Sequence, residues 1–446
     1  MIKTLKKAFQ IQEIRNRILF VFFILVVVRI GCEIPVPGVN TDYIASLLQG
    51  QAGDAFNFFD AITGGSFMSM SIFALNISPY ITSSIVVQLL TIAIPKLEEL
   101  QKDGEDGRKK IAKLTRYLTV VLALIEASAM VIGFGGNGLL PVYTWYTAVV
   151  AVAAMTAGSA MLMWMGEQIT EKGVGNGISV ILLINIVSGL PDDFMTLYER
   201  FIADADVAVK VIAIVIIAVI LFAMIVFVVL LQDGERRIPV QNSAKMSNRI
   251  MAAGRSYNKP LVLKVNTAGV IPVIFASSLM TTPAVIAQFF DVDYTSVGGQ
   301  ILMGLSSSNW CRPDAPIYSI GLVVYCALII VFAYFYTSIT FNPIEIADTM
   351  KRQGSFIPGI RPGKPTSDYL QKILNYIIFI GAVGLLIVAL IPIVFSGLFS
   401  VSRLSFMGTS LIIIVGVILE TLKQIETMMQ QRSYKDVRSE GLFINY

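Results

Sequence analysis

Long uninterrupted apolar runs limit what this chain can fold into more than any other feature of its sequence. Val211–Leu231 and Ile377–Ile393 carry no charged residue, and Ile18–Val28 is a shorter run of the same kind. A helix of about 20 such residues crosses the hydrocarbon of a bilayer with its backbone hydrogen bonds satisfied internally. Only 14% of the residues are charged, whereas a soluble chain carries about 25%. The mean hydropathy is +0.73, and the sequence therefore predicts an all-α polytopic membrane protein.

Charged residues and Gly/Pro-rich segments separate the apolar runs into expected membrane spans. Boundaries read in this way are uncertain by a few residues. The ten expected spans lie near 18–35, 74–95, 114–134, 145–169, 178–191, 208–231, 266–289, 317–340, 370–395 and 404–425.

The distribution of Lys and Arg predicts the orientation. If the N-terminus is cytoplasmic, all but five of the 34 basic residues fall in segments on the cytoplasmic side. Basic residues accumulate on that side of a membrane protein, so we expect both termini in the cytoplasm. The five exceptions are Arg29, Arg200, Lys210, Arg312 and Arg403.

Ten spans divide into two halves of five, residues 1–205 and 206–446. Halves with an odd number of spans face opposite ways, as in inverted-repeat proteins that open around a central path. Two short matches support this division, although matches of this length also arise by chance. They are Pro79-Tyr-Ile81 with Pro272-Val-Ile274, and Gly177-Ile-Ser179 before Leu182 with Gly408-Thr-Ser410 before Ile413.

The stretch that leads into the second span contains residues that loosen a helix. It begins with Gly64 and Gly65, continues with a Ser/Met-rich run, and places Asn76 and Pro79 where a simple membrane helix carries Leu. Glycine permits backbone bends that other residues resist. The stretch therefore predicts something other than a plain second span.

Few polar groups in the spans are available for chemistry. Glu126 lies near the middle of span three, where a carboxylate is functional, or is protonated, or faces a watery interior. Glu167, Glu420 and Arg29 lie close to span ends, where snorkelling to the interface explains them.

The residue inventory also argues against an enzyme. The chain has no His, and its three Cys form no CxxC pair, so Ser-His dyads and the common zinc motifs are absent. It has no GxxxxGK[ST] loop for ATP. We therefore expect no catalytic residue, no metal site and no cofactor.

Two long basic loops, about 232–265 and 341–369, are expected in the cytoplasm. Each is either a solvated loop that rests on anionic lipid or a docking surface. The sequence PGIRPGKP favours docking, because its Gly-Pro pattern builds a stiff tip that presents Arg361. An Arg fork binds phosphate or carboxylate, so both RNA and an acidic protein are plausible partners.

Several long motifs resemble the SecY family, the channel subunits of the bacterial protein translocase. The resemblance covers the chain from the first span to the C-terminal tail, with its parts in the family's order. The motifs are SIFALNISPYITSSIVVQLL (71–90), EDGRKKIAKLTRY (105–117), WMGEQITEKGVGNGISVIL (164–182), KVNTAGVIPVIFASS (264–278), FNPIEIAD (341–348), FIPGIRPGKPT (356–366) and GTSLIII (408–414).

The resemblance implies an hourglass channel that carries unfolded secretory polypeptides across the bacterial cytoplasmic membrane. Its plug helix would be residues 61–73, hinged at Gly64 and Gly65, and would pack loosely because it has to move. Apolar segments would leave sideways between spans two/three and seven/eight. A midplane ring of aliphatic side chains would close the pore to ions. The ring positions are Ile77, Ile81, Leu182, Ile186, Ile274 and Ile413.

The resemblance also implies partners. These are the small membrane subunits SecE and SecG, the SecA motor ATPase, the ribosome, signal peptides with nascent chains, and membrane lipids. Arg361 matches the position tied to motor-driven transport. The expected RNA-facing residues are Arg236, Arg237, Lys245, Arg249 and Arg255.

Three positions depart from the family pattern, and one other class of protein stays open. Asn76 replaces a common glycine, Leu182 replaces a frequent isoleucine, and Glu126 replaces an uncharged polar residue. The alternative is an ion-coupled secondary transporter with inverted repeats. Such a transporter normally needs several intramembrane carboxylates, and Glu126 is the single candidate.

Overall fold

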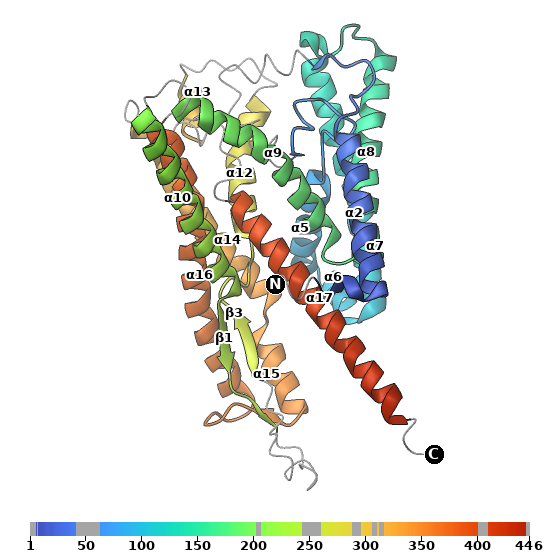
Figure 1. Ribbon diagram of the computed structural model, residues 1–446, viewed down its shortest axis with the longest axis vertical. Helices are drawn as coiled ribbons and strands as arrows, with labels where there is room; N and C mark the ends of the chain where they lie inside the picture. The colour runs from blue at the N-terminus through green and yellow to red at the C-terminus, as the bar shows by residue number, and fades with distance from the viewer. Residues whose placement is uncertain are drawn as a thin grey trace.

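A computed structural model gives the arrangement of the chain (Figure 1). It describes residues 6, 8–41, 63–201, 207–242, 260–287, 296–305, 310–311, 316–399 and 409–442. The boundary between the expected halves, near 205, lies outside these residues.

Helices dominate both halves of the chain. In the first half they are α2 (Gln12–Cys32), α5 (Ser78–Ala93), α6 (Pro95–Lys102), α7 (Glu105–Phe134), α8 (Trp145–Lys172) and α9 (Gly177–Phe201), with a π-turn at Gly135–Leu139. In the second half they are α10 (Val207–Asp233), α12 (Ile271–Ala287), α13 (Val297–Leu305), α14 (Ile320–Thr340), α15 (Pro343–Arg352), α16 (Lys364–Phe399) and α17 (Thr409–Leu442), with a 3₁₀ turn at Pro316–Ser319.

Every expected span coincides with a helix. Within the part of the chain that the structure describes, six helical stretches are long and apolar enough to cross a membrane by themselves, and α5 with α6 makes a seventh if that pair, bent by 105°, is one span. Span two starts at Ser78 rather than near 74, because Asn76 has a left-handed φ of +50° and Pro79 occupies the first turn of α5.

The prolines of the suggested repeat occupy equivalent places. Pro79 is the second residue of α5 and Pro272 is the second residue of α12. Proline suits the first turn of a helix because the first amides have no intrahelical partner. Gly177 begins α9, while its counterpart Gly408 lies outside the described residues.

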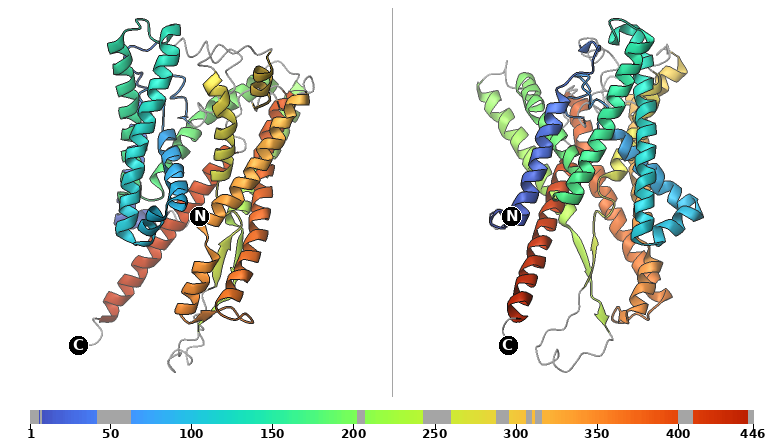
Figure 2. Two further views of the ribbon diagram at one scale, coloured as in Figure 1. Left: turned by 180° about the vertical axis from the view of Figure 1, so that it is seen from behind. Right: turned by 90° about the vertical axis from the view of Figure 1, so that its right-hand side faces the viewer.

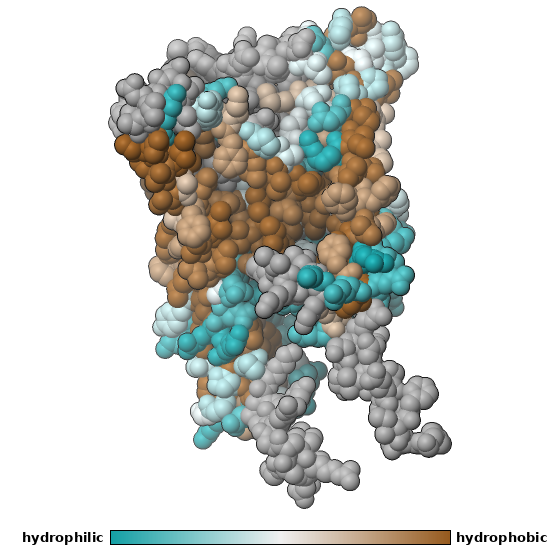
Figure 3. Space-filling model, viewed as in Figure 1, coloured by the Kyte–Doolittle hydropathy of each residue, from teal (hydrophilic) through white to brown (hydrophobic). Residues whose placement is uncertain are grey.

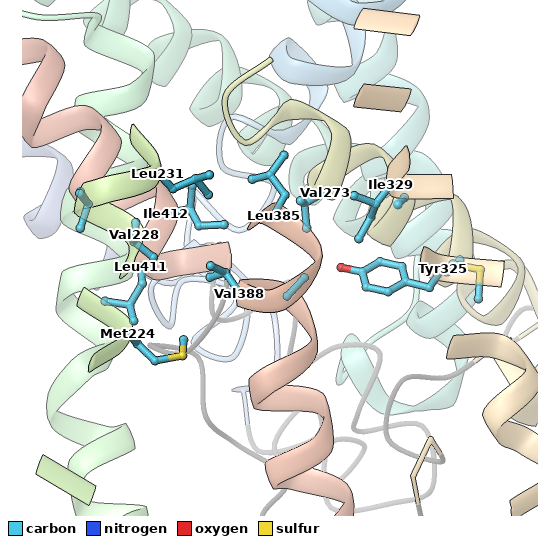
Figure 4. Close-up of a cluster of buried hydrophobic side chains, with 14 of the residues drawn as sticks. Met224, Val228, Leu231, Val273, Tyr325, Ile329, Leu385, Val388, Leu411 and Ile412 are labelled. Atoms are coloured by element: carbon cyan, nitrogen blue, oxygen red, sulfur yellow. The ribbon is translucent and has the colours of Figure 1, made fainter. Parts of the chain in front are cut away.

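The helices form two bundles that lie side by side (Figures 1 and 2). One contains α2, α5, α7 and α8, and the other contains α10, α12, α14 and α16. The second bundle has its own core, in which Met224, Val228 and Leu231 of α10 face side chains of α16 and α17 (Figure 4). Each bundle therefore folds around its own apolar centre.

The face of the molecule seen in Figure 3 carries a broad hydrophobic belt with hydrophilic residues toward both ends. Large apolar side chains such as Phe222 and Ile132 are 70% and 67% exposed. A water-soluble protein rarely exposes so much contiguous apolar surface. The belt is the face that meets lipid, and the chain is a multi-pass membrane protein.

Besides the helices, the two long basic loops contain short strands. Strand β1 (Glu235–Ile238) pairs with β3 (Leu261–Lys264), and β2 (Gln241–Asn242) pairs with β4 (Ser355–Phe356), both antiparallel. The second pair joins the 232–265 loop to the 341–369 loop. The two loops also share a small core of Ile238, Leu263, Met350, Ile357, Leu370 and Ile377. They form one unit, which we call the loop module.

An aliphatic cluster between the two halves as the candidate functional site

All six expected ring residues lie in one hydrophobic cluster, which we call the aliphatic cluster. Four of them, Ile77, Leu182, Ile186 and Ile413, are at most 8% exposed, and Ile81 and Ile274 are partly buried. The first half of the chain contributes four of the six, and the second half contributes two.

Short-range geometry explains how these side chains reach the cluster. Ile77 is the N-cap of α5 and Ile81 lies in its first turn. Leu182 and Ile186 are separated by four residues on α9 and therefore share one face of that helix. On α17, Leu411 and Ile412 pack in the core of the second bundle, while Ile413 joins the aliphatic cluster. Helix α17 thus contributes side chains both to the core of the second bundle and to the aliphatic cluster.

One side of the junction between the halves is packed much more closely than the other. Among the described residues, α9 and α17 are the helices that pack extensively across the two halves. The Gly175 amide also donates to Gln424 Oε1 across them, at 2.6 Å. Neither α5 with α12 nor α7 with α14 packs in this way. The two bundles are therefore fastened along α9 and α17.

Residues 63–77, which we call the turn segment, lead directly into α5 beside the aliphatic cluster. After Thr63 the backbone runs through successive turns up to Ser78, so the helix expected at 61–73 is not formed over its described part; residues 61 and 62 lie outside it. Gly64 and Gly65 have φ values of +66° and +84°. Glycine adopts this left-handed conformation without steric cost.

The turn segment is bound to the residues that follow α2. The Val36 amide donates to the Met70 carbonyl, and the Ile72 amide donates to the Ile34 carbonyl, both at 2.9 Å. Arg29 Nη1 donates to the Gly64 carbonyl at 3.0 Å. The sequence explained Arg29 by snorkelling, and its hydrogen bond to the turn segment was missed.

The expected loose packing of this segment is wrong for its described part. Met70 is fully buried and Phe67 is 6% exposed. A Cβ atom at Gly158 of α8 would lie 2.0 Å from the Ile72 carbonyl oxygen, and one at Gly31 would overlap the Phe73 ring. Glycines on two neighbouring helices therefore let the segment pack at close range.

A cavity of about 610 Å³ lies beside the cluster and is lined by residues of α5, α7, α8, α9 and α17 and of the turn before α9. Its lining includes Tyr80 and Ile178, which also belong to the aliphatic cluster. Arg116 Nε donates to Glu167 Oε1 at 2.6 Å within this lining. Glu167 is thus paired with a partner that the sequence did not indicate. The remaining lining residues are Thr170, Glu171, Gly175, Asn176, Glu420 and Gln424.

The structure separates the expected docking residues into two groups. Arg236 and Arg237 are exposed on β1, and Arg361 is exposed on the turn after β4. Gly359 and Gly363 flank that turn with φ values of +82° and +104°, and Thr366 Oγ1 donates to the Arg361 carbonyl. Lys245, Arg249 and Arg255 lie outside the described residues.

Glu126 offers little support for ion coupling. It is partly buried on α7, and no ion pair joins it to another described residue. The described part of the chain contains no group of three or more Cys, Asp or Glu that could hold a metal ion.

These observations define a polytopic helical membrane protein. Its two bundles meet in an aliphatic cluster, and the tightly packed turn segment lies beside that cluster. Similar folds are known. A SecY structure whose title concerns the plug domain has a TM-score of 0.61 at 17% identity, covering 93% of this chain and 92% of that one. Sec61 in the canine ribosome-channel complex has a TM-score of 0.59 at 16% identity, covering 92% and 91%.

Sequence relatives are closer. "Protein translocase subunit SecY" of Streptomyces galbus is 40% identical over 448 residues, covering 98% of this chain and 99% of that protein. The subunit of the same name from Halalkalibacterium halodurans is 41% identical over 441 residues, with the same coverage. A family model described as SecY matches residues 71–422. The chain belongs to the SecY family.

Proposed function

We propose that this chain is a protein-conducting channel that moves unfolded secretory polypeptides across the cytoplasmic membrane. In this proposal the aliphatic cluster is the constriction, and apolar segments leave sideways into the bilayer. The chain itself hydrolyses nothing, and a motor ATPase or a translating ribosome supplies the energy.

One observation carries this proposal. Six aliphatic side chains, contributed by α5, α9, α12 and α17 and by the residue that caps α5, gather where the two halves meet. A narrow apolar constriction sheds water and blocks ions. Because it has no charge or fixed hydrogen-bonding group, it offers a passing polypeptide no strong binding site.

The packing between the halves supports a sideways exit. The halves are fastened along α9 and α17, whereas α5 and α7 do not pack extensively on α12 and α14 among the described residues. Parting α5 and α7 from α12 and α14 would therefore break fewer contacts than parting α9 from α17. A segment rich in Leu gains a few tenths of a kcal/mol per residue by entering lipid, and each charge costs about 3 kcal/mol.

The loop module is the proposed binding surface for the motor and the ribosome. It combines the exposed Arg236, Arg237 and Arg361 on two loops that share one core. Guanidinium groups bind both phosphate and carboxylate. We place SecE and SecG beside the membrane-spanning helices, and both termini in the bacterial cytoplasm.

Reconstitution tests the proposal. Purified protein with its small subunits goes into vesicles, and a radiolabelled secretory precursor is added with SecA and ATP. We expect precursor that is protected from protease, and none for the same precursor without its signal peptide. Protection that does not depend on the channel protein would overturn the proposal.

Ion-coupled transport of a small solute is the competing function, and the comparisons give it no support. Its single candidate coupling group is Glu126. Solute uptake driven by an ion gradient in the same vesicles, abolished by Glu126→Gln, would favour the transporter.

A further inference from the structure

We infer that Asn76 and Asn185 form a releasable clasp that positions the constriction and sets how readily it opens. Asn185 Nδ2 donates to Asn76 Oδ1 at 3.1 Å. The inference rests on the proposed channel function and assigns a role to two residues that lie outside the ring.

The first argument is the position of the two amides in the chain. Asn76 directly precedes Ile77, and Asn185 directly precedes Ile186. One hydrogen bond therefore joins the start of α5 to the middle of α9, immediately beside a cluster residue on each. Four of the six expected ring residues lie on α9 or at the start of α5. A bond at this point fixes their separation.

The second argument is burial. Asn76 is 1% exposed and Asn185 is fully buried. Burying an amide costs free energy unless the amide is hydrogen-bonded, so the bond between these two side chains offsets a cost that a surface pair would not have. Asn185 Oδ1 has no hydrogen-bond partner among the described residues. The amide of Asn185 is thus only partly paired among these residues, which makes the clasp easier to release than a fully paired network.

The third argument is that Asn185 supports both ends of the turn segment. At one end its side chain holds Asn76. At the other end its backbone carbonyl lies so close to Gly64 that a Cβ atom there would be 2.5 Å away. Ser188 Oγ donates to the Asn185 carbonyl at 2.6 Å and reaches the Gly64 carbonyl at 3.4 Å. Movement of α9 would therefore disturb both ends together.

The backbone at Asn76 is adapted to this contact. Its φ of +50° is left-handed, a conformation that Asn tolerates and most residues resist. Ser159 Oγ of α8 donates to its carbonyl at 3.1 Å. The amide is presented to α9 by a fixed turn, so it is pre-positioned before the bond forms.

The backbone geometry dictates the test variants. Asn76→Gly removes the amide and keeps the left-handed conformation, and Asn185→Ala removes the other amide inside a helix. Ser83→Ala is the matched control, because Ser83 is also fully buried and, among the described residues, bonds only to the Pro79 carbonyl of its own helix. Each protein is purified with its small subunits, and resting conductance is measured in planar bilayers in potassium chloride without substrate.

We expect each single variant to raise resting conductance by about fivefold, the factor that one net hydrogen bond contributes. The double variant should leak no more than the leakier single variant, because both changes remove the same bond. Ser83→Ala should match the wild type. Unchanged conductance in both single variants, or a double variant whose increase equals the product of the two, would overturn the clasp.

A second readout separates positioning from general damage. In the vesicle assay, Asn76→Gly and Asn185→Ala should transport a precursor with a defective signal at several times the wild-type rate, with intact precursor nearly unchanged. Equal losses for both precursors would show damage only and contradict the inference. If the wild type moves no precursor at all, the proposed function fails, while the conductance comparison still decides whether the amides interact.

Discussion

Gly158→Ala adds one methyl group where α8 passes the turn segment. The Cβ atom would lie 2.0 Å from the Ile72 carbonyl oxygen and 2.8 Å from its carbon, whereas ordinary van der Waals contact starts at 3.4 Å. The obstacle is backbone, which cannot rotate away as a side chain can. The segment and α8 must therefore separate by roughly 1.4 Å, the difference between those distances.

Two opposing contributions set the size of the effect. Ala is better than Gly inside a helix by about 1 kcal/mol. Overpacking a tight contact costs about 1–3 kcal/mol, and a backbone obstacle belongs at the upper end of that range. The net expectation is a loss of about 1–2 kcal/mol in the free energy of unfolding. Because the turn segment leads into Ile77, the displacement should also raise resting ion conductance.

The same helix provides a matched control in Gly166. A Cβ atom there would meet Ile178 Cδ1 at 2.5 Å, which is the far end of a flexible side chain. That side chain can rotate, so Gly166→Ala should be neutral or stabilising by up to about 1 kcal/mol. Both variants add the same methyl group to α8 and differ in what it meets.

Thermal unfolding in detergent and conductance in planar bilayers measure the two effects. We expect a lower melting temperature and a higher leak for Gly158→Ala, with Gly166→Ala at or above the wild type in stability and equally tight. If Gly158→Ala is as stable and as tight as the wild type, α8 and the turn segment do not pack as closely as described. Equal damage in both variants would refute the distinction between backbone and side-chain obstacles.

Three further predictions test other parts of the molecule. Ile81→Asn or Ile274→Asn should introduce a polar amide into the aliphatic cluster and raise conductance in planar bilayers at least tenfold; a tight variant would show that its residue lies away from the constriction. Arg361→Glu should abolish SecA-driven export in the vesicle assay while leaving thermal stability unchanged, whereas Lys364→Glu should retain most export; normal export by the Arg361 variant would remove this residue from the motor site. Glu126→Gln should leave precursor transport within about twofold of the wild type. Loss of precursor transport in this variant would give the Glu126 carboxylate a role in the channel.

Much of the candidate site could be predicted from local sequence. The i,i+4 spacing of Ile77 with Ile81 and of Leu182 with Ile186 assigned each pair to one side of its element, and family motifs selected these pairs from many aliphatic residues. Left-handed backbone at Gly64 and Gly65 also followed from residue type. The roles of the ring, the hinge and the docking residues remain predictions.

Contacts between distant residues could not be predicted in this way. Arg29 binds a carbonyl 35 residues away, Arg116 pairs with a carboxylate 51 residues away, and Asn76 meets Asn185 across 109 residues. No periodicity relates such partners. Snorkelling was a sufficient local explanation for Arg29 and Glu167, and it concealed their actual bonds.

The sequence alone determined that this chain spans a bilayer, where its long apolar helices lie and which family it resembles. Hydrophobicity and helical periodicity act over one or two turns, so they can be read directly from the residues. Tertiary structure decided that the turn segment is tightly packed, that the two basic loops share one core, and that two asparagine side chains meet beside the aliphatic cluster. Those outcomes depend on backbone approach and on the pairing of buried polar groups, which only the folded chain brings together.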